Sequence, residues 1–522
     1  MSWTKQGGPS GPRGYHHGNL KEALIRAALV LIAKKGLAGV TFAEAARWAG
    51  VSPAAPYRHF SHRDQLLADV ARRGFEQFEA ALRQAWNSGR PDPFTAFAHV
   101  GRAYLQFARN EPAYYSAMFE AGIPLQSSSQ LRDAGEGCFG VLREAVEQKK
   151  APGVVAMASR GDEVIYQGAF GKRASTKDVP MTLDSIFHIA SMTKAVTAVA
   201  VLQLIESGRV KLDEPAATYL PELAKVQVLE EFDPATKKAK LRPPKTPPTV
   251  RQLLTHTSGF GYDFFDVRLH DYVEAGLAPA ITGDSDAFLK APLMFDPGTH
   301  WEYGISYDWL GELVEQVSGE TLEEYFRRHI LEPLGMTDTF FNVPAEKQAR
   351  VVALQLRQAD GSFVEPPPQP MKPVKFFSGG GGLYSTAGDY LKFERMVLNG
   401  GMFGGKRILR AETVAEMSHN QIGEMKLAEL RSTIPQLIKN PVRLPGSPDK
   451  FGWGFGINSR AVEGGRAAGS LAWDGIFNTF FWIDVSGKTC GVVLMQTLPF
   501  SDDGALAAEE EFERALYASA AR

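Results

Sequence analysis

The spacing of apolar residues changes near residue 140 of this 522-residue chain, and this change excludes one uniform fold. Before that point, apolar residues recur at helical spacing, as in Asn19–Lys35. After it, Gly153–Ala158 and Glu163–Phe170 have the composition of β-strands, and Arg160–Asp162 forms a hairpin turn between them. A chain this long also exceeds what one hydrophobic core usually serves. We therefore predict a multidomain protein, with an all-α N-terminal domain followed by an α/β domain.

Charge is distributed unevenly between the two parts. Residues 1–75 hold 11 Lys and Arg against 4 Asp and Glu, whereas the rest of the chain holds 46 against 55. A basic N-terminal part on an acidic body is typical of a nucleic-acid-binding module joined to another domain. A solvated basic face would give the same pattern, so charge alone does not decide between them.

No sign of export, membrane insertion or a cofactor is present in the sequence. Met1–Gly14 is polar and rich in Gly and Pro, so it lacks the apolar core of a secretory signal. Apolar stretches such as Ala195–Ile205 are too short to span a bilayer. Cys138 and Cys490 are too few for a disulfide framework and have no metal-ligand spacing. We expect a cytoplasmic protein with no cofactor, no metal and no membrane contact.

The N-terminal part contains the signals of a helix-turn-helix within residues 41–60. Thr41–Glu44 is a capping box that opens a short helix. Gly50–Ser52 forms a tight turn, and Pro53 then favours a third helix that ends near Phe60. Two short helices joined by such a turn form the helix-turn-helix motif.

The string Val51–Phe60, followed by Arg63–Leu67, resembles the DNA-binding domain of TetR-type repressors. In such proteins the third helix enters the major groove of double-stranded DNA. The resemblance implies that five residues lie at the operator: Ser52, Ala54, Tyr57, Arg58 and His59. Of these, Tyr57 and His59 would touch phosphates. Alternatively, Tyr57 packs against the first helix, as we expect for Phe60.

Residues 76–140 continue with helical segments, including Phe94–Asn110 and Ala113–Phe119. They resemble the first half of a TetR-type regulatory domain, and the half that supplies the dimer interface is missing. A homodimer is one expected assembly, because helix-turn-helix proteins bind two half-sites, but the lost helices would weaken it. We predict a disordered tail at 1–17, a DNA-binding domain at 18–78, a truncated helical regulatory domain at 79–138 and a further domain at 139–522.

Ser191 and Lys194 stand at the start of an apolar helical segment in the C-terminal part. Phe187–Ile205 has helical periodicity, and Gly208 ends it. Residues three apart share a helix face, so the Lys194 ammonium can reach the Ser191 hydroxyl. A serine needs a neighbouring base to become nucleophilic, and burial can lower the pKa of a lysine enough for that role. This S-x-x-K pairing is the signature of penicillin-recognising enzymes.

The tetrapeptide alone proves little, because composition predicts about two matches by chance. The chain holds three of them: Ser2–Lys5, Ser191–Lys194 and Ser447–Lys450. The first lies in the tail and the third in a loop rich in Pro and Gly, so neither offers a rigid geometry. Only Ser191 opens an apolar helix behind a hairpin, and this context makes it the predicted nucleophile.

Further motifs follow Ser191 in a fixed order: Arg251–Gly259, Pro297-Gly298, Tyr303 with Asp308–Gly311, Pro333–Met336 and Gly379–Thr386. Together they resemble the class C β-lactamase superfamily, most of all its family VIII carboxylesterases, from about Phe139 onward. The resemblance implies an α/β domain whose antiparallel sheet is built from both ends of this region, with a helical subdomain between them. Three predicted strands would complete the sheet: Phe451–Ser459, Thr479–Asp484 and Cys490–Gln496.

The second motif of that superfamily is Tyr-x-Asn. Here Tyr303 is kept, and Ile305 stands at the asparagine position. The resemblance implies that Tyr303 shares the role of base with Lys194 and returns a proton to the leaving group. Taken alone, Tyr303 would more simply be a hydrogen-bonded core tyrosine.

The third motif, Lys-Thr-Gly in the superfamily, appears here as Trp473-Asp474-Gly475. Trp473 replaces the lysine that meets a β-lactam carboxylate, as in the esterase branch, and the charge of Asp474 would disfavour anionic substrates. The N–H of Ile476 would pair with that of Ser191 as the oxyanion hole. We therefore place Ile476, Trp473 and Gly475 in the substrate pocket, with core packing as the alternative for Trp473.

Three remaining features narrow the chemistry. His256 lies in a string that is structural in the superfamily, so we leave it out of catalysis. Gly379–Gly382 is not followed by the Lys of a phosphate loop and is expected to pack closely beside the active site. No G-x-S-x-G string occurs, which excludes an α/β-hydrolase nucleophile elbow.

The predicted function is that of a serine hydrolase, a carboxylesterase or acyl transferase, working through an acyl-Ser191 intermediate on small ester or acyl substrates. Its head would be a TetR-type DNA-binding regulator. One alternative is a repressor whose β-lactamase-like domain senses a ligand; another is a β-lactamase or D-alanyl peptidase-like activity. A fusion made by rearrangement would also explain the shortened regulatory domain. A purely sensory domain would not need Lys194 and Tyr303.

Overall fold

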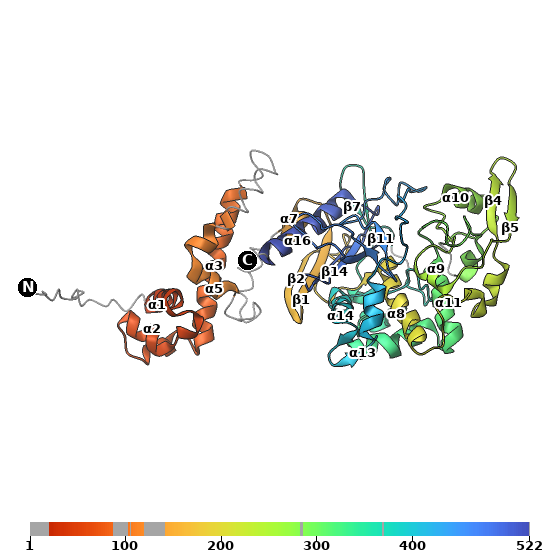
Figure 1. Ribbon diagram of the computed structural model, residues 1–522. Coiled ribbons are helices and arrows are strands. Elements are labelled where there is room, and N and C mark those ends of the chain that lie inside the picture. The colour runs from red at the N-terminus through yellow and green to blue at the C-terminus, as the bar shows by residue number, and fades with distance from the viewer. Residues whose placement is uncertain are drawn as a thin grey trace, which may run out of the picture. The chain divides into compact units, whose positions relative to one another are not determined.

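The computed structural model describes residues 20–86, 103–104, 106–119, 141–281, 285–367 and 370–520 (Figure 1). The chain divides into two compact units, residues 1–140 and 141–522, and each is described by itself. The predicted tail, Cys138 and most of the predicted helix Phe94–Asn110 lie outside the described residues.

The described residues of the first unit form helices and the turns that join them. Its elements are, in order, α1 (Leu20–Lys35), η1 (Leu37–Gly39), α2 (Phe42–Ala49), η2 (Ala55–Arg58), α3 (Arg63–Trp86) and α5 (Pro112–Phe119). Helix α1 packs against α2, α3 and α5, and the shared core includes Leu24, Leu31, Leu67 and Phe75. The apolar face predicted for the first helix is therefore the face that the neighbouring helices cover.

Helix α2 begins and ends where the sequence predicts. The Thr41 side chain accepts a hydrogen bond from the Glu44 N–H at 3.2 Å, which satisfies one of the free N–H groups of the first turn. At the other end, Gly50 adopts φ 70°, a left-handed conformation that favours glycine.

The third helix is shorter than predicted. Instead of a helix to Phe60, the chain forms only the 3₁₀ turn η2. Pro56 is the physical reason, because it has no N–H with which to extend an α-helix. The N–H groups of His59 and Phe60 both donate to the Pro56 carbonyl, each at 3.0 Å, and so close the turn.

The second unit is built on a seven-stranded antiparallel sheet in the order β11-β12-β13-β14-β15-β1-β2. Its strands are β1 (Gly153–Arg160), β2 (Glu163–Gly171), β11 (Lys450–Phe451), β12 (Gly456–Ile457), β13 (Leu471–Gly475), β14 (Thr479–Asp484) and β15 (Thr489–Leu494). The first strand pairs with the last, with Val155 opposite Leu494. The prediction of an antiparallel sheet made from both ends of this region is confirmed.

The predicted strand Phe451–Ser459 is instead two short strands, β11 and β12, around a turn. Gly454 in this turn adopts φ 95° and lies so close to helix α8 (Thr193–Glu206) that an added Cβ would come within 2.7 Å of Ala198. The backbone therefore turns where it meets the helix, which a continuous strand could not do.

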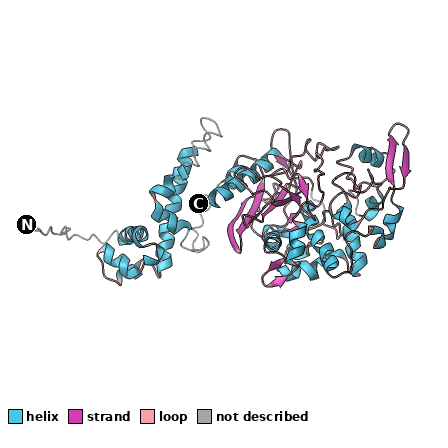
Figure 2. Ribbon diagram, in the orientation of Figure 1, coloured by secondary structure: helices cyan, strands magenta, loops and turns pink. Residues whose placement is uncertain are grey.

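Helices cover both faces of the sheet, as Figure 2 shows. On one face Phe481 of β14 packs against Tyr390 of α14 (Ala387–Leu398), with ring centroids 5.1 Å apart. On the other face Trp482 packs against Phe512 of α16 (Asp503–Ala520), with centroids 6.0 Å apart. Helix α7 (Val141–Glu147) lies beside α16 on that second face.

The chain between β2 and β11 contains the helical subdomain that the resemblance implies and also α14, which lies on the sheet. Its helical elements are η5 (Ala190–Met192), α8, η6 (Ala216–Thr218), η7 (Pro221–Lys225), α9 (Val250–Leu254), α10 (Val267–Glu274), η8 (Asp286–Lys290), α11 (Ser306–Ser318), α12 (Leu322–Phe326), the π-helical η9 (Arg327–Leu331), α13 (Glu332–Leu334), η10 (Ala345–Arg350), α14 and α15 (Ala411–Met417). Short strands also occur: β3 (Phe187–His188), β4 (Val228–Asp233), β5 (Lys238–Arg242), β6 (Gln355–Arg357), β7 (Phe363–Val364), β8 (Tyr384–Ser385), β9 (Met402–Phe403), β10 (Lys406–Arg407) and, after the sheet, β16 (Thr497–Leu498). Helix α8 is buried on all sides at the centre of the core.

Candidate active site

Ser191 and Lys194 lie where strand β3 turns into helix α8. Ser191 is in the 3₁₀ turn η5, and Lys194 follows in the first turn of α8. The Lys194 Nζ donates a hydrogen bond to the Ser191 Oγ at 3.1 Å. Ala190, just before the serine, adopts φ 43°, a conformation that costs a non-glycine residue energy and that is often kept at functional sites.

Lys194 is enclosed, with 1% of its surface exposed. Its Nζ donates to the Gly380 carbonyl at 2.6 Å and lies over the rings of Tyr303 and Tyr262, 4.7 and 5.4 Å from their centroids. Burial lowers the pKa of Lys194 to about 7, and the negative charge of Asp308 opposes that fall. A large part of the Lys194 population is therefore neutral near pH 7 and able to accept a proton.

Tyr303 is brought to the same place from the loop before α11. Its hydroxyl oxygen accepts a hydrogen bond from Trp473 Nε1 at 3.1 Å. Burial raises the pKa of Tyr303 above its ordinary value, while hydrogen bonds with Ser191 and Trp473 act against that rise. Tyr303 is thus a neutral phenol at neutral pH, with its proton available to a neighbour.

The end of strand β13 lies against the turn that carries Ser191. An added Cβ on Gly475 would collide with the Ile189 carbonyl and the Thr479 hydroxyl, so only glycine allows this approach. The Thr479 hydroxyl also donates to the Ile189 carbonyl at 3.3 Å. Ile476, half-buried, begins the turn between β13 and β14 directly after this contact.

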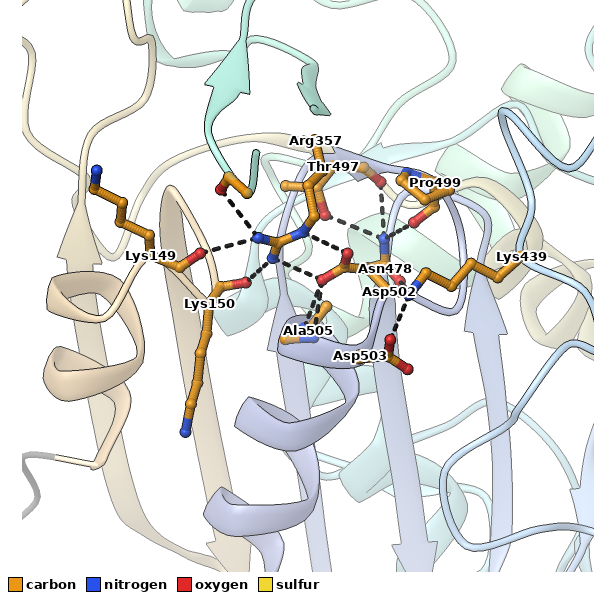
Figure 3. Close-up of polar contacts among 12 residues, drawn as sticks. Lys149, Lys150, Arg357, Lys439, Asn478, Thr497, Pro499, Asp502, Asp503 and Ala505 are labelled. Atoms are coloured by element: carbon orange, nitrogen blue, oxygen red, sulfur yellow. Dashed lines mark hydrogen bonds and ion pairs between the residues drawn. The ribbon is translucent and has the colours of Figure 1, made fainter. Parts of the chain in front are cut away.

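Asn478 fixes the other side of that turn (Figure 3). It adopts φ 57° and is fully buried. Its Nδ2 donates to the carbonyls of Thr497 and Pro499, each at 2.9 Å, and its Oδ1 accepts from the Asp502 N–H at 3.3 Å. Each polar atom of this side chain is thereby used to hold the turn that contains Ile476.

Asp502 and Arg357 extend this support, as Figure 3 shows. Arg357 Nη2 donates to Asp502 Oδ1 at 2.8 Å, and its Nη1 donates to the Lys149 carbonyl at 3.1 Å. Asp502 Oδ1 also accepts from the Ala505 N–H at 3.0 Å and so caps α16. Sequence reasoning missed this network. Its local signal is the aspartate before a helix, whereas Arg357 lies 145 residues away in the chain.

Asp474 does not face the site, contrary to the sequence-based interpretation. Side chains alternate along a strand, so Asp474 points to the side of the sheet opposite Trp473. There it is buried and interacts with Arg466, a cation that also bonds Glu509 and Glu513 of α16. Burial raises the pKa of Asp474 to about 8, so it carries little negative charge at neutral pH.

The loop Gly379–Gly382 packs against the site as predicted. Thr197 of α8 donates to the Gly379 carbonyl at 2.7 Å, one turn after the bond from Lys194 to Gly380. His256 lies nearby, with its ring centroid 4.9 Å from that of Tyr303. Its Nδ1 accepts from the Gly304 N–H at 3.4 Å, so this nitrogen does not serve Ser191.

The first unit presents the residues predicted to contact DNA to solvent. All five are exposed: Ser52, Ala54, Tyr57, Arg58 and His59. Tyr57 is 64% exposed and touches Phe42 only through a ring contact at 4.9 Å, whereas Phe60 is 2% exposed, as expected for a core residue. The turn η2 therefore places exposed and buried residues within a few positions of each other.

None of the described helices has both the length and the apolar character needed to cross a membrane.

Two families match the chain. The family described as Beta-lactamase matches residues 140–516, and the family described as bacterial regulatory proteins, tetR family, matches residues 24–70. Monacolin J acid methylbutanoyltransferase of Aspergillus terreus is 32% identical over 398 residues, which cover 72% of this chain and 94% of that protein. Lovastatin esterase of Penicillium rubens is 31% identical over 391 residues, which cover 72% of this chain and 96% of the esterase.

A solved structure agrees with these matches. The LovD6 mutant of simvastatin synthase (LOVD) from Aspergillus terreus superposes with a TM-score of 0.63 at 31% identity. The superposition covers 73% of this chain and 96% of the synthase. The beta-lactamase family match thus covers almost all of the second unit, whereas the match to the tetR family lies in the first unit.

Proposed function

Because this chain belongs to the beta-lactamase family through residues 140–516, we propose that it hydrolyses or transfers carboxylic acyl groups through an ester of Ser191. The observation that carries the proposal is the buried Lys194, whose pKa is lowered to about 7 and whose Nζ lies 3.1 Å from the Ser191 Oγ. A base is most effective when its pKa lies near the working pH.

Acylation begins with a proton transfer from the Ser191 hydroxyl to neutral Lys194. The Ser191 Oγ then attacks the carbonyl carbon of the ester, and the carbonyl oxygen becomes an oxyanion. The N–H groups of Ser191 and Ile476 would stabilise that charge from the meeting point of η5 and β13. The close contact between Gly475 and Ile189 supports this pairing, because it brings the two turns together.

Tyr303 delivers the proton that the leaving alcohol needs. Its raised pKa keeps the phenol protonated, so its role is that of an acid and proton relay rather than of the first base. The leaving alkoxide takes the Tyr303 proton, and the Lys194 ammonium returns one to the tyrosine. Water or an acceptor alcohol then attacks the acyl-serine by the same steps in reverse, which regenerates Ser191.

Neutral esters are the proposed substrates. Trp473 stands where the family has a lysine, and its N–H is used by Tyr303, so this position offers no cation to a substrate carboxylate. This favours an esterase or acyltransferase over a β-lactamase. The similar proteins named for a methylbutanoyl transfer and for a lovastatin ester suggest a short branched acyl group on a bulky alcohol.

We also propose that the head binds an operator in double-stranded DNA through Tyr57, Arg58 and His59. The tetR family match at 24–70 implies DNA binding, and the exposure of these side chains on η2 supports the assignment. Binding of two half-sites would require a homodimer. The catalytic apparatus in the second unit supports an enzyme more than a ligand sensor, because a sensor needs no buried base beside a serine.

Turnover of p-nitrophenyl acetate and butyrate by the wild type and by Ser191→Ala tests the proposal. We expect wild-type turnover to fall by about 10³-fold or more in Ser191→Ala, because the covalent route is lost. Ser447→Ala is the matched control, since it removes the serine of another S-x-x-K string and should retain full activity. Equal rates for the wild type and Ser191→Ala would refute the proposed catalysis through Ser191.

A further inference from the structure

Asp308 is a buried carboxylate that belongs to one of the sequence motifs but has no role in the proposed steps. It lies on the first turn of α11, five residues after Tyr303, and 1% of its surface is exposed. A carboxylate is costly to bury unless hydrogen bonds and opposite charge compensate it. The partners of Asp308 therefore indicate what it is for.

Both hydrogen-bond partners of Asp308 belong to the glycine loop beside the site. Its Oδ1 accepts from the Ser378 hydroxyl at 2.5 Å and from the Gly380 N–H at 3.1 Å. An added Cβ on Gly380 would come within 2.5 Å of Asp308 Oδ2, so the contact admits only glycine. Asp308 of α11 thus holds the loop by accepting two hydrogen bonds from it.

The same loop holds the lysine. The Gly380 carbonyl accepts the hydrogen bond from Lys194 Nζ at 2.6 Å, and the Gly379 carbonyl accepts from Thr197 at 2.7 Å. The backbone N–H and the carbonyl of Gly380 therefore connect Asp308 of α11 with Lys194 of α8. A shift of this loop would move the acceptor that fixes the position of the Lys194 nitrogen.

Lys194 and Asp308 also interact through their charges. The titratable groups that face Lys194 are Asp308, His256, Tyr303 and Tyr262. Burial and Lys194 itself lower the pKa of His256 far below its ordinary value, and burial raises the pKa of both tyrosines. These three are neutral at neutral pH. Among the described residues facing Lys194, Asp308 is left as the group that can carry negative charge.

The pKa of the Asp308 carboxyl lies above its ordinary value, because burial outweighs the groups that favour the ionised form. Burial raises the pKa of its carboxyl, whereas Lys194 and the donors from Ser378 and Gly380 lower it. Two hydrogen bonds to one carboxylate oxygen favour the ionised form. An ionised Asp308 favours the protonated form of Lys194.

We propose that Asp308 is the positioning residue of this site: its carboxylate fixes the loop that orients Lys194 and supplies the charge that sets how readily Lys194 releases its proton. The inference rests on the proposed function of Lys194 as the base. Asp308 acts through Lys194 and the Gly380 peptide and does not touch the substrate.

The test compares pH profiles of kcat/KM for p-nitrophenyl butyrate in the wild type, Asp308→Asn and Ser378→Ala. Asparagine keeps the acceptor but removes the charge, so we expect the acid limb to move to lower pH. A shift of one pH unit raises the activity of Asp308→Asn at low pH, relative to its own plateau, by about tenfold. Ser378→Ala keeps the Asp308 carboxyl and its bond from the Gly380 N–H, so its limb should move less than that of Asp308→Asn while kcat falls.

Asp389→Asn is the matched control. Asp389 is also a buried carboxylate, 4% exposed, that accepts from the Asp338 N–H at 2.6 Å, but it lies on α14 and does not act on Lys194. Its profile should match that of the wild type. An Asp308→Asn profile with a lowered plateau and an unmoved acid limb would overturn the proposal. If Asp308→Asn does not fold, Asp308→Ser, which also removes the charge, replaces it.

A second measurement does not depend on turnover. Lysine labelled with carbon-13 at Cε gives an NMR signal for Lys194, assigned by its loss in Lys194→Met, whose titration yields the pKa directly. A lower Lys194 pKa in Asp308→Asn than in the wild type supports the inference even if no ester is turned over, in which case only the proposed function fails. An unchanged Lys194 pKa overturns the inference even where turnover is normal.

Discussion

Lys194 in the second unit and Arg58 in the first are both basic side chains at candidate sites, but their surroundings are opposite. Lys194 is 1% exposed and is bonded to Ser191 and Gly380. Arg58 is exposed on a turn whose neighbour Tyr57 is 64% exposed. Lys194 is held in a fixed position away from water, whereas Arg58 remains in solvent.

The difference follows from what each site has to do. A general base must be partly neutral near pH 7, and burial achieves this by penalising the charged form. A cation that attracts DNA must keep its charge and meet a ligand that arrives from solvent, so it stays exposed. The comparison predicts large, local effects for substitutions in the second unit and small, salt-dependent effects in the first.

The largest expected effect is that of Tyr303→Phe. Removing the hydroxyl deletes the proton donor to the leaving group, so we expect kcat for p-nitrophenyl butyrate to fall by about 10²- to 10⁴-fold. Tyr325→Phe, which alters another buried tyrosine on α12, should retain wild-type turnover. DNA binding should be the same in both variants. A loss of DNA binding in Tyr303→Phe would show that the two units do not function independently.

Lys194→Met should change how stability depends on pH. Between about pH 7 and pH 10 the unfolded chain binds the Lys194 proton and the folded chain does not, so wild-type stability gains up to about 1.4 kcal/mol per pH unit from this residue. The variant lacks this gain. Urea unfolding at several pH values should therefore show the wild type gaining stability relative to Lys194→Met as pH rises, and parallel curves would show that Lys194 is not a buried base.

Asn478→Gly should lower kcat by about tenfold with little change in KM, because a poorly held Ile476 N–H stabilises the oxyanion less. Glycine retains the left-handed backbone at this position, so the variant removes only the side-chain bonds. Lys439→Met is the control in the same region, since it removes an exposed ion pair with Asp503 (Figure 3). If kcat is unaffected in Asn478→Gly, the turn does not need this support.

The smallest effect should be that of Arg58→Ala on DNA binding. Loss of one positive charge beside the DNA should weaken binding about fivefold on any sequence and reduce the salt dependence by about one counterion. Fluorescence anisotropy with duplex DNA at several salt concentrations measures both. Arg83→Ala removes the same charge from the far end of α3 and should leave the affinity for DNA unchanged. An equal loss of affinity in both variants would show that net charge alone, and not the position of Arg58, causes the effect.

Local patterns in the sequence were enough to predict the hairpin and the apolar helix of the second unit, but not where that helix begins. The hairpin β1–β2 depends on residues that are near one another in the chain, and it is confirmed. The helical segment predicted from Phe187 instead starts with strand β3 and the 3₁₀ turn η5 that carries Ser191, and α8 begins at Thr193. The predicted length of the third helix in the first unit was wrong. Pro53 favours a helix start, but Pro56 prevents the helix from extending beyond a 3₁₀ turn.

Residues that act through distant partners could not be predicted in this way. Tyr303 entered the site only through the family resemblance, since nothing near it in the sequence marks a bond to Trp473, 170 residues away. Asp308 bonds Ser378 across 70 residues, and Arg357 bonds Asp502 across 145. Spacing in the sequence says nothing of such contacts, because the packing of separate helices and strands creates them.

The central claim is that Ser191 carries the acyl group. Intact-mass spectrometry of the full chain, quenched in acid during turnover of p-nitrophenyl butyrate, measures this directly. The account predicts a species heavier by one butyryl group, with the modified peptide containing Ser191 and no such species in Ser191→Ala. Turnover by the wild type without that adduct under rapid quenching, or an adduct on another residue, would contradict it.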